Sequence, residues 1–240
     1  MKPKKATNPM NDPLSSTLRP DRRRILLAGL GLAGSAALWT GGMTGSAAAA
    51  AEDENPGWGE SVTENGWPVL GEATSHRIQG AGSLTVPLLA GDVATVLLHV
   101  IRRFHYEIAD LGEGEVSGHA RHWTFTEDYE SNYLSGTAIA IRPGSYPVGV
   151  AGGFFPNELL ILRDVLADCE GTVLWGGDKR RAKESHFEIA VKPRDPALAR
   201  VAKKIAAWGD APGEGAGATD PTASPRRRAA RALERRQRAA

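Results

Sequence analysis

Two histidines, His119 and His122, have a type and a spacing that could do chemistry. Residues three apart lie on one face of a helix, so two imidazoles at this spacing could share a metal ion. The pair alone is a weak signal for a metal site, because surface histidines beside glycine are common. A metal centre in this chain would therefore need donors from elsewhere in the sequence.

The sole cysteine, Cys169, excludes an internal disulfide even in an oxidising compartment. It stands two residues before Gly171, at the end of an apolar segment that we expect to be helical. A nucleophilic thiol needs a neighbouring base, and none is adjacent in the sequence. We therefore interpret Cys169 as a buried structural thiol. The sequence also has neither a Gly-x-Ser-x-Gly nucleophile elbow nor a phosphate-binding loop.

A third set of residues resembles a known family in its order and spacing. The family is that of the zinc D-alanyl-D-alanine carboxypeptidases, the VanY-like group that also includes phage and bacterial cell-wall endopeptidases. The resemblance covers about residues 66–192 and depends on RFHYEIADL (103–111), SNYLSGTAIAI (131–141), YPVGVAGGF (146–154), DCEGTVLWGGD (168–178) and ESHFEI (184–189). It implies a small α+β fold of the D-Ala-D-Ala carboxypeptidase (hedgehog/DD-peptidase) type, zinc as the cofactor and peptidoglycan stem peptides as the partner.

The family's first motif is Ser-x-His-x-x-Gly-x-Ala-x-Asp, in which the histidine and the aspartate bind zinc. Ser131, Gly136 and Ala138 match this motif. The histidine position is occupied by Tyr133 and the aspartate position by Ala140. Two of the three zinc ligands that the resemblance implies are therefore replaced.

The family's second motif places an acidic general base three residues before a zinc-binding histidine. His186 matches that histidine, but Lys183 occupies the position of the base. Glu184, two residues before His186, is the candidate catalytic carboxylate, although a strand would turn it to the opposite side. By the same resemblance, Arg121 and Trp175 join Ser131 as candidate substrate-binding residues.

A hydrolytic zinc site needs three protein donors and a water whose pKa the metal lowers to about 7. Ala140 has no donor, and a neutral tyrosine with a pKa of about 10 is a poor ligand. The charge of Lys183 would oppose metal binding further. We therefore expect weak or absent zinc binding at His186, and impaired or lost hydrolysis.

Two alternatives remain open at this point. One is an active zinc peptidase with substituted ligands, drawn from residues just upstream of Tyr133: His119, His122, Asp128 and Glu130. The other is a non-catalytic cell-envelope protein, which either retains the pocket as a peptide-binding cleft or attaches to a partner through its arginine-rich end.

The elements that must position these residues follow from hydrophobic periodicity. Apolar residues at three- and four-residue steps predict a helix from Asp92 to Leu111, and similar patterns predict helices over 157–168 and 195–208. Short apolar runs predict strands at Leu84–Leu89, His122–Phe125, Thr137–Arg142, Thr172–Trp175 and His186–Val191. Because strands and helices do not alternate strictly, we expect an α+β fold with a small, mostly antiparallel sheet.

Both ends of the chain are basic, whereas residues 52–208 carry 15 Lys/Arg and 22 Asp/Glu, a formal charge of −7. Residues 1–51 resemble a twin-arginine export signal, because Arg22 to Arg24 precede an uncharged Leu/Ala/Gly segment that ends in alanines. We expect cleavage near Ala49–Ala51 and an extracellular or cell-envelope location. The alternative is a membrane anchor, for which the apolar segment is short.

Residues 209–240 begin with Gly, Ala, Pro, Ser and Asp and end in PRRRAARALERRQRAA. Such a composition cannot bury a core, so we predict a disordered basic tail that can be helical in its last dozen residues. The tail could also bind an anionic envelope polymer or a membrane surface. Because the chain is expected to be exported, we do not expect nucleic acid as a partner of this tail. The segment between the two basic ends, residues 52–208, is the predicted peptidase-like domain.

Overall fold

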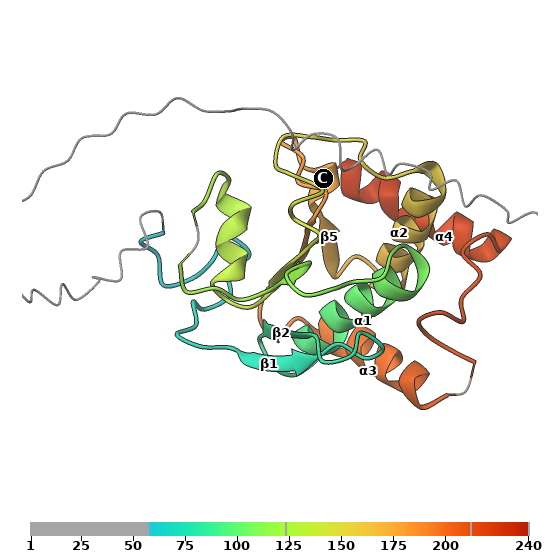
Figure 1. Cartoon of the computed structure of the whole chain (residues 1–240), viewed down its shortest axis with the longest axis horizontal. Coiled ribbons are helices and arrows are strands. Elements are labelled where there is room, and N and C mark those ends of the chain that lie inside the picture. The colour runs from blue at the N-terminus through green and yellow to red at the C-terminus, as the bar shows by residue number, and fades with distance from the viewer. Residues whose placement is uncertain (1–57, 123, 212, 240) are drawn as a thin grey trace, which may run out of the picture. The chain divides into compact units, whose positions relative to one another are not determined.

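The computed structural model describes residues 58–122, 124–211 and 213–239 (Figure 1). The export signal predicted for residues 1–51 lies outside these residues. The helices are α1 (Asp92–Glu107), α2 (Pro156–Asp168), α3 (Pro196–Asp210) and α4 (Ser224–Arg238), with 3-10 turns η2 (Asp128–Tyr133) and η3 (Gly176–Asp178). The strands are β1 (Thr74–Arg77), β2 (Thr85–Leu88), β3 (Val116–Ser117), β4 (Ala138–Ile141), β5 (Val173–Trp175) and β6 (His186–Ile189).

The strands form two antiparallel sheets. Strands β1 and β2 pair as a hairpin, and the other four form a sheet in the order β3-β4-β6-β5. The predicted α+β class with a small antiparallel sheet is thus confirmed. Every helix within the described ranges is too short or too polar to traverse a bilayer.

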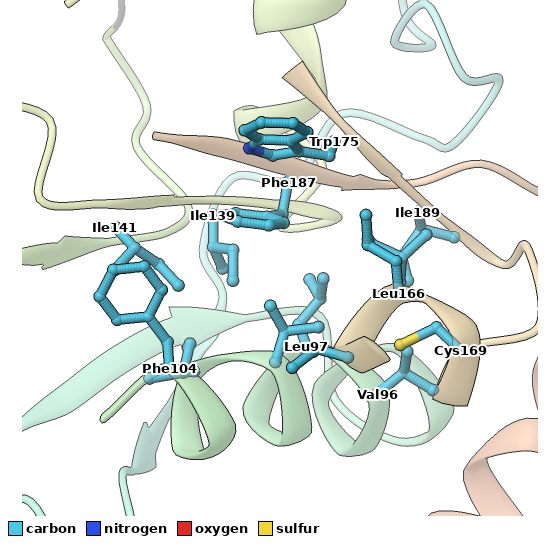
Figure 2. Close-up of a cluster of buried hydrophobic side chains, with 14 of the residues drawn as sticks. Val96, Leu97, Phe104, Ile139, Ile141, Leu166, Cys169, Trp175, Phe187 and Ile189 are labelled. Atoms are coloured by element: carbon cyan, nitrogen blue, oxygen red, sulfur yellow. The ribbon is translucent and has the colours of Figure 1, made fainter. Parts of the chain in front are cut away.

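The two faces of the four-stranded sheet have different roles because side chains alternate along a strand. Ile139 of β4 and Phe187 of β6 point to the side of α1, where they meet Val96 and Leu97 (Figure 2). Cys169 is fully buried at the end of α2 beside this core, and burial raises the pKa of its thiol. The apolar residues whose spacing predicted α1, among them Val96 and Leu97, are the ones that face this core.

The opposite face of the sheet carries Ala138 and Ala140, which form a second buried cluster with Tyr133 of η2. All four residues of β4 are buried, because α1 covers one face and η2 the other. The turn between η2 and β4 needs Gly136, whose φ is +64° and whose Cβ, if present, would lie 2.6 Å from the backbone nitrogen of Leu89. Glycine at this position thus allows the turn to approach β2.

One predicted strand and the predicted end of one helix are wrong. No strand forms at 122 or at 124–125, because the edge of β4 pairs with the earlier strand β3, in the register Val116–Ile141. Helix α1 ends at Glu107 rather than Leu111, and the backbone N–H of Leu111 donates to Nδ1 of His105 (3.0 Å). In α3, whose predicted helix over 195–208 does form, Asp195 is the N-cap and accepts from the N–H of Ala197 (2.8 Å).

Within the predicted tail, Ser224–Arg238 form α4, a longer helix than the last dozen residues for which a helix was expected, and α4 packs along α2 (Figure 1). The reason is a set of ion pairs between residues far apart in sequence. Arg226 contacts Asp164 (2.7 Å) and Asp168 (2.8 Å) of α2, and the fully buried Arg103 of α1 contacts the same two carboxylates. Apolar contact adds to this, since Ala230 and Leu233 are buried.

We predict that Arg226→Ala loosens α4. The substitution removes one of two cations from a pair of buried carboxylates, so the free energy of unfolding should fall by about 1–3 kcal/mol. Urea unfolding measures this change, and limited proteolysis should cut residues 213–239 sooner. The matched control is Arg228→Ala, at an exposed residue of the same helix. Equal stability of the two variants would contradict the role of the ion pairs.

Candidate functional site

The candidate site lies on the sheet face that η2 covers. Ala140 of β4 is directly opposite His186 of β6 in the strand register. The last residue of η2, Tyr133, places its ring 5.2 Å from the imidazole of His186, measured between centroids. The three positions that correspond to zinc ligands in the resembled family are therefore adjacent, and all three residues are 0% exposed.

Both ring nitrogens of His186 have hydrogen-bond partners. Nδ1 lies 2.8 Å from the hydroxyl of Tyr133, and Nε2 lies 2.9 Å from Oε2 of Glu188. Burial raises the pKa of Tyr133 well above its ordinary value, so the phenol keeps its proton. Nε2–H of His186 donates to Glu188, and Nδ1 shares the second hydrogen bond with the Tyr133 hydroxyl.

Glu188 is a buried carboxylate surrounded by donors. Besides His186, it accepts from the side-chain amide of Asn132 (2.7 Å) and from Nζ of Lys179 (2.6 Å). Burial alone would raise the pKa of Glu188, but the interactions with His186 and Lys179 outweigh burial and hold the pKa at about 2. We call Asn132, Tyr133, Lys179, His186 and Glu188 the His186 cluster.

A second buried ion pair lies next to this cluster. Nζ of Lys183 is 2.5 Å from Oε1 of Glu130 and 5.2 Å from the centre of the Tyr133 ring. The other oxygen of Glu130 accepts from the N–H and the hydroxyl of Thr126 (2.6 and 2.8 Å). Burial opposes the charge of Glu130, but the hydrogen bond from Lys183 and those from Thr126 lower its pKa. The residue at the family's general-base position is thus a cation paired with a carboxylate.

The other predicted site residues are not part of the His186 cluster. Glu184 accepts from the backbone N–H groups of Gly152 and Gly153 (2.7 and 2.8 Å) and thereby holds that loop. The indole N–H of Trp175 donates to the carbonyl of Glu184 (2.8 Å), and its ring packs on Phe154.

Two further predicted residues, Ser131 and Arg121, were assigned to substrate binding. Ser131 is fully buried, and its hydroxyl accepts from the N–H of Glu64 (2.9 Å). Arg121 is exposed in the segment before η2. Of the two, only Arg121 is open to a ligand in solution.

The substitute donors upstream of Tyr133 are dispersed or already engaged. Nε2 of His119 lies 3.1 Å from the carbonyl oxygen of Leu70, and His122 and Asp128 are exposed. Glu130 forms the ion pair with Lys183. Across the part of the chain that the structure describes, no group of three or more His, Cys, Asp or Glu residues is placed to hold a metal ion.

The residues at the three family positions do not fit zinc. Ala140 offers no donor, the phenol of Tyr133 holds its proton, and neither nitrogen of His186 is without a hydrogen-bond partner. The positive charge of Lys183 beside the Tyr133 ring adds repulsion. The arrangement can instead hold a rigid, fully paired polar core beneath η2.

The sequence did not lead us to Glu188 or to its other donors, Asn132 and Lys179. Glu188 could have been found, because residues two apart on a strand share a face and His186 and Glu188 both belong to the predicted strand. Asn132 lies in the 3-10 turn η2, and Lys179 follows the 3-10 turn η3. No periodic pattern in the sequence indicates either residue.

Comparisons with known proteins do not place the chain in a family. No protein-family model, no curated protein and no solved structure matches it. The assignment of a function therefore depends on the chemistry of the residues and on the resemblance of the motifs.

We predict that Glu188 makes folding stability depend on acid pH. Its pKa is about 2 in the folded chain against an ordinary 4.5, so its ionised form stabilises the fold above about pH 4.5. That contribution, roughly 3 kcal/mol, should be lost as the pH falls toward 2.

Glu188→Gln should therefore be less stable than the parent at neutral pH, and the difference should shrink on acidification. Urea unfolding across this pH range measures both chains. Glu113→Gln, at an exposed carboxylate, is the control and should follow the parent. A Glu188→Gln difference that is independent of pH would contradict the buried, ionised state.

Proposed function

We propose that this chain is an exported, non-hydrolytic homologue of the zinc D-alanyl-D-alanine carboxypeptidase family that binds peptidoglycan stem peptides. The observation that supports this most is the convergence of Tyr133, Ala140 and His186. The motif resemblance predicts that these three positions meet, and they lie together on one face of the β4–β6 pair. Chance similarity of short motifs gives no reason for such a meeting.

The absence of hydrolysis in the proposal follows from the donors at these positions. A hydrolytic metal needs three ligands and an open coordination site for water. Here one position is a methyl group, one is a protonated phenol, and the histidine is bonded at both nitrogens. A carboxylate that could take a proton from water is also missing at position 183, where a lysine is paired with Glu130.

Peptide binding in the proposal relies on cations at the edge of the site. Arg180 and Arg181 are exposed just after η3, and Arg181 contacts Glu127 (3.1 Å) at the start of η2. The hydroxyl of Tyr129 in η2 donates to the carbonyl of Arg181 (3.3 Å), which fixes these cations next to the covered site. With the exposed Arg121, they suit the free carboxylates of stem peptides.

The experiment combines zinc content, muropeptide hydrolysis and binding to insoluble peptidoglycan, all measured on the full chain. We expect zinc well below one ion per chain, no release of D-alanine, and retention on peptidoglycan. Arg180→Gln/Arg181→Gln should weaken retention, whereas Arg194→Gln/Arg200→Gln, at exposed residues elsewhere, should not. Stoichiometric zinc with turnover would refute the non-hydrolytic proposal, and no retention would refute peptide binding.

We also predict that the lost ligands can be restored. Tyr133→His/Ala140→Asp should raise zinc affinity by roughly tenfold or more, because it returns two donors beside His186. Tyr133→Phe/Ala140→Asn removes the same phenol but adds no comparable ligand, so it is the matched control. Isothermal titration with zinc compares the two.

Turnover should require a further change at the Lys183–Glu130 pair. Lys183→Asp supplies the missing base but leaves the buried Glu130 unpaired, so Glu130→Gln must accompany it. We expect D-alanine release only when these two substitutions are combined with Tyr133→His/Ala140→Asp. If the variant with all four substitutions binds no zinc while it remains folded, the resemblance does not extend to the geometry of the site.

A further inference from the structure

The outer side of α4 is a continuous cationic surface. Residues 224–238 contain seven arginines and one acidic residue, Glu234. Arg226, Ala230, Leu233 and Gln237 face inward: Arg226 contacts α2, Ala230 and Leu233 are buried, and Gln237 donates to the carbonyl of Val173 (2.8 Å). The inward face therefore holds the helix in place.

Four exposed arginines lie outside this inward face. Arg227, Arg231 and Arg235 follow at four-residue steps, which are about 6 Å apart along a helix, and Arg228 lies beside them. All four are exposed, and none forms an ion pair with another described residue. Glu234 does not neutralise them, since it contacts Arg163 (3.3 Å) and Arg238 (3.0 Å). We call these four residues the α4 arginine stripe.

A partly apolar hollow lies beside the stripe, between α2 and α4. Its volume is about 200 Å³, and its lining is partly apolar, from Pro156, Leu159, Leu160, Pro221 and Ala230, and partly charged, from Arg163, Arg227, Arg231 and Glu234. Phe155, the residue before Pro156, is 61% exposed. Two arginines of the stripe thus line a partly apolar hollow between α2 and α4, which run side by side in Figure 1, and an exposed aromatic residue precedes α2.

We propose that the α4 arginine stripe, the hollow and Phe155 form a docking surface for an anionic lipid bilayer. Arginines at this spacing suit lipid phosphates, while the hollow and the aromatic ring suit the apolar region just below the headgroups. A wholly polar polymer would use the arginines but leave the apolar residues of the hollow and Phe155 in water. The mixed chemistry therefore favours lipid over polymer.

The charge of the rest of the chain gives this docking a direction. Residues 52–208 have a formal charge of −7, whereas residues 224–238 have +6. An anionic surface attracts α4 and repels residues 52–208, so this domain should bind with α4 toward the lipid. This inference does not depend on the proposed peptide binding, because none of its residues belongs to the His186 cluster or its basic edge.

The test is co-sedimentation of the full chain with vesicles of phosphatidylglycerol and phosphatidylcholine, compared with phosphatidylcholine alone. We expect binding to the anionic vesicles only, weakened by high salt. Each arginine near such a surface adds about a fivefold factor to the binding constant, so R227Q/R228Q/R231Q/R235Q should lower it by roughly two orders of magnitude or more.

The matched control is R180Q/K192Q/R194Q/K203Q, which removes the same charge from exposed residues outside α4. Both variants retain residues 1–57, so any binding by that segment is common to them. The four stripe side chains make no ion pairs, so thermal unfolding should show that the stripe variant stays folded. Equal loss of vesicle binding in stripe variant and control would overturn the proposal.

A second variant distinguishes lipid from a soluble polyanion. Phe155→Ser should weaken binding to anionic vesicles several-fold and leave binding to inorganic polyphosphate unchanged, because only the bilayer offers an apolar region to the ring. If Phe155→Ser has no effect on vesicles and polyphosphate displaces the chain fully, the surface recognises an anionic polymer and the lipid assignment is wrong.

Discussion

The burial of one carboxylate, Glu188, determines the arrangement around the candidate site. An ionised carboxylate in a protein interior must be surrounded by donors, and Glu188 has them from His186, Asn132 and Lys179. These donors come from a strand, from η2 and from the end of η3, so the requirement ties three separate segments together. Tyr133 completes the set because it supplies the partner for the second nitrogen of His186.

The same constraint explains why the site differs from a metal centre although its positions resemble one. A zinc ion and a paired carboxylate are alternative ways to satisfy a buried imidazole, and this chain uses the second. Once His186 is bonded on both sides, a lysine at position 183 is no longer repelled by a metal and can pair with Glu130. The residues Tyr133, Ala140 and Lys183 are therefore chemically consistent with one another.

Periodic patterns predicted the helices and strands that have a buried side. They failed where contacts between residues far apart in the sequence determine which segments pair or pack. The short runs of β4 and β6 and the apolar spacing of α1 were sufficient because burial acts residue by residue. Strand β3 has two residues and no alternation to detect, and its place was wrongly given to His122–Phe125. The packing of α4 on α2 was not predicted, because it depends on contacts of Arg226 with Asp164 and Asp168, more than fifty residues away. In the candidate site, Tyr133, Ala140 and His186 were named by the family resemblance, whereas Lys179 depends on the tertiary fold alone.

Cys169 is the only thiol of the chain and lies fully buried beside the core, with its pKa raised by burial. An oxidant or a second thiol can reach it only after the end of α2 separates from α1 and the sheet. The covalent structure of the folded chain should therefore be the same in reducing and in oxidising surroundings. Folding before a change of compartment would then carry no redox penalty, and a thiol-labelling reagent would report only the fraction of molecules that open.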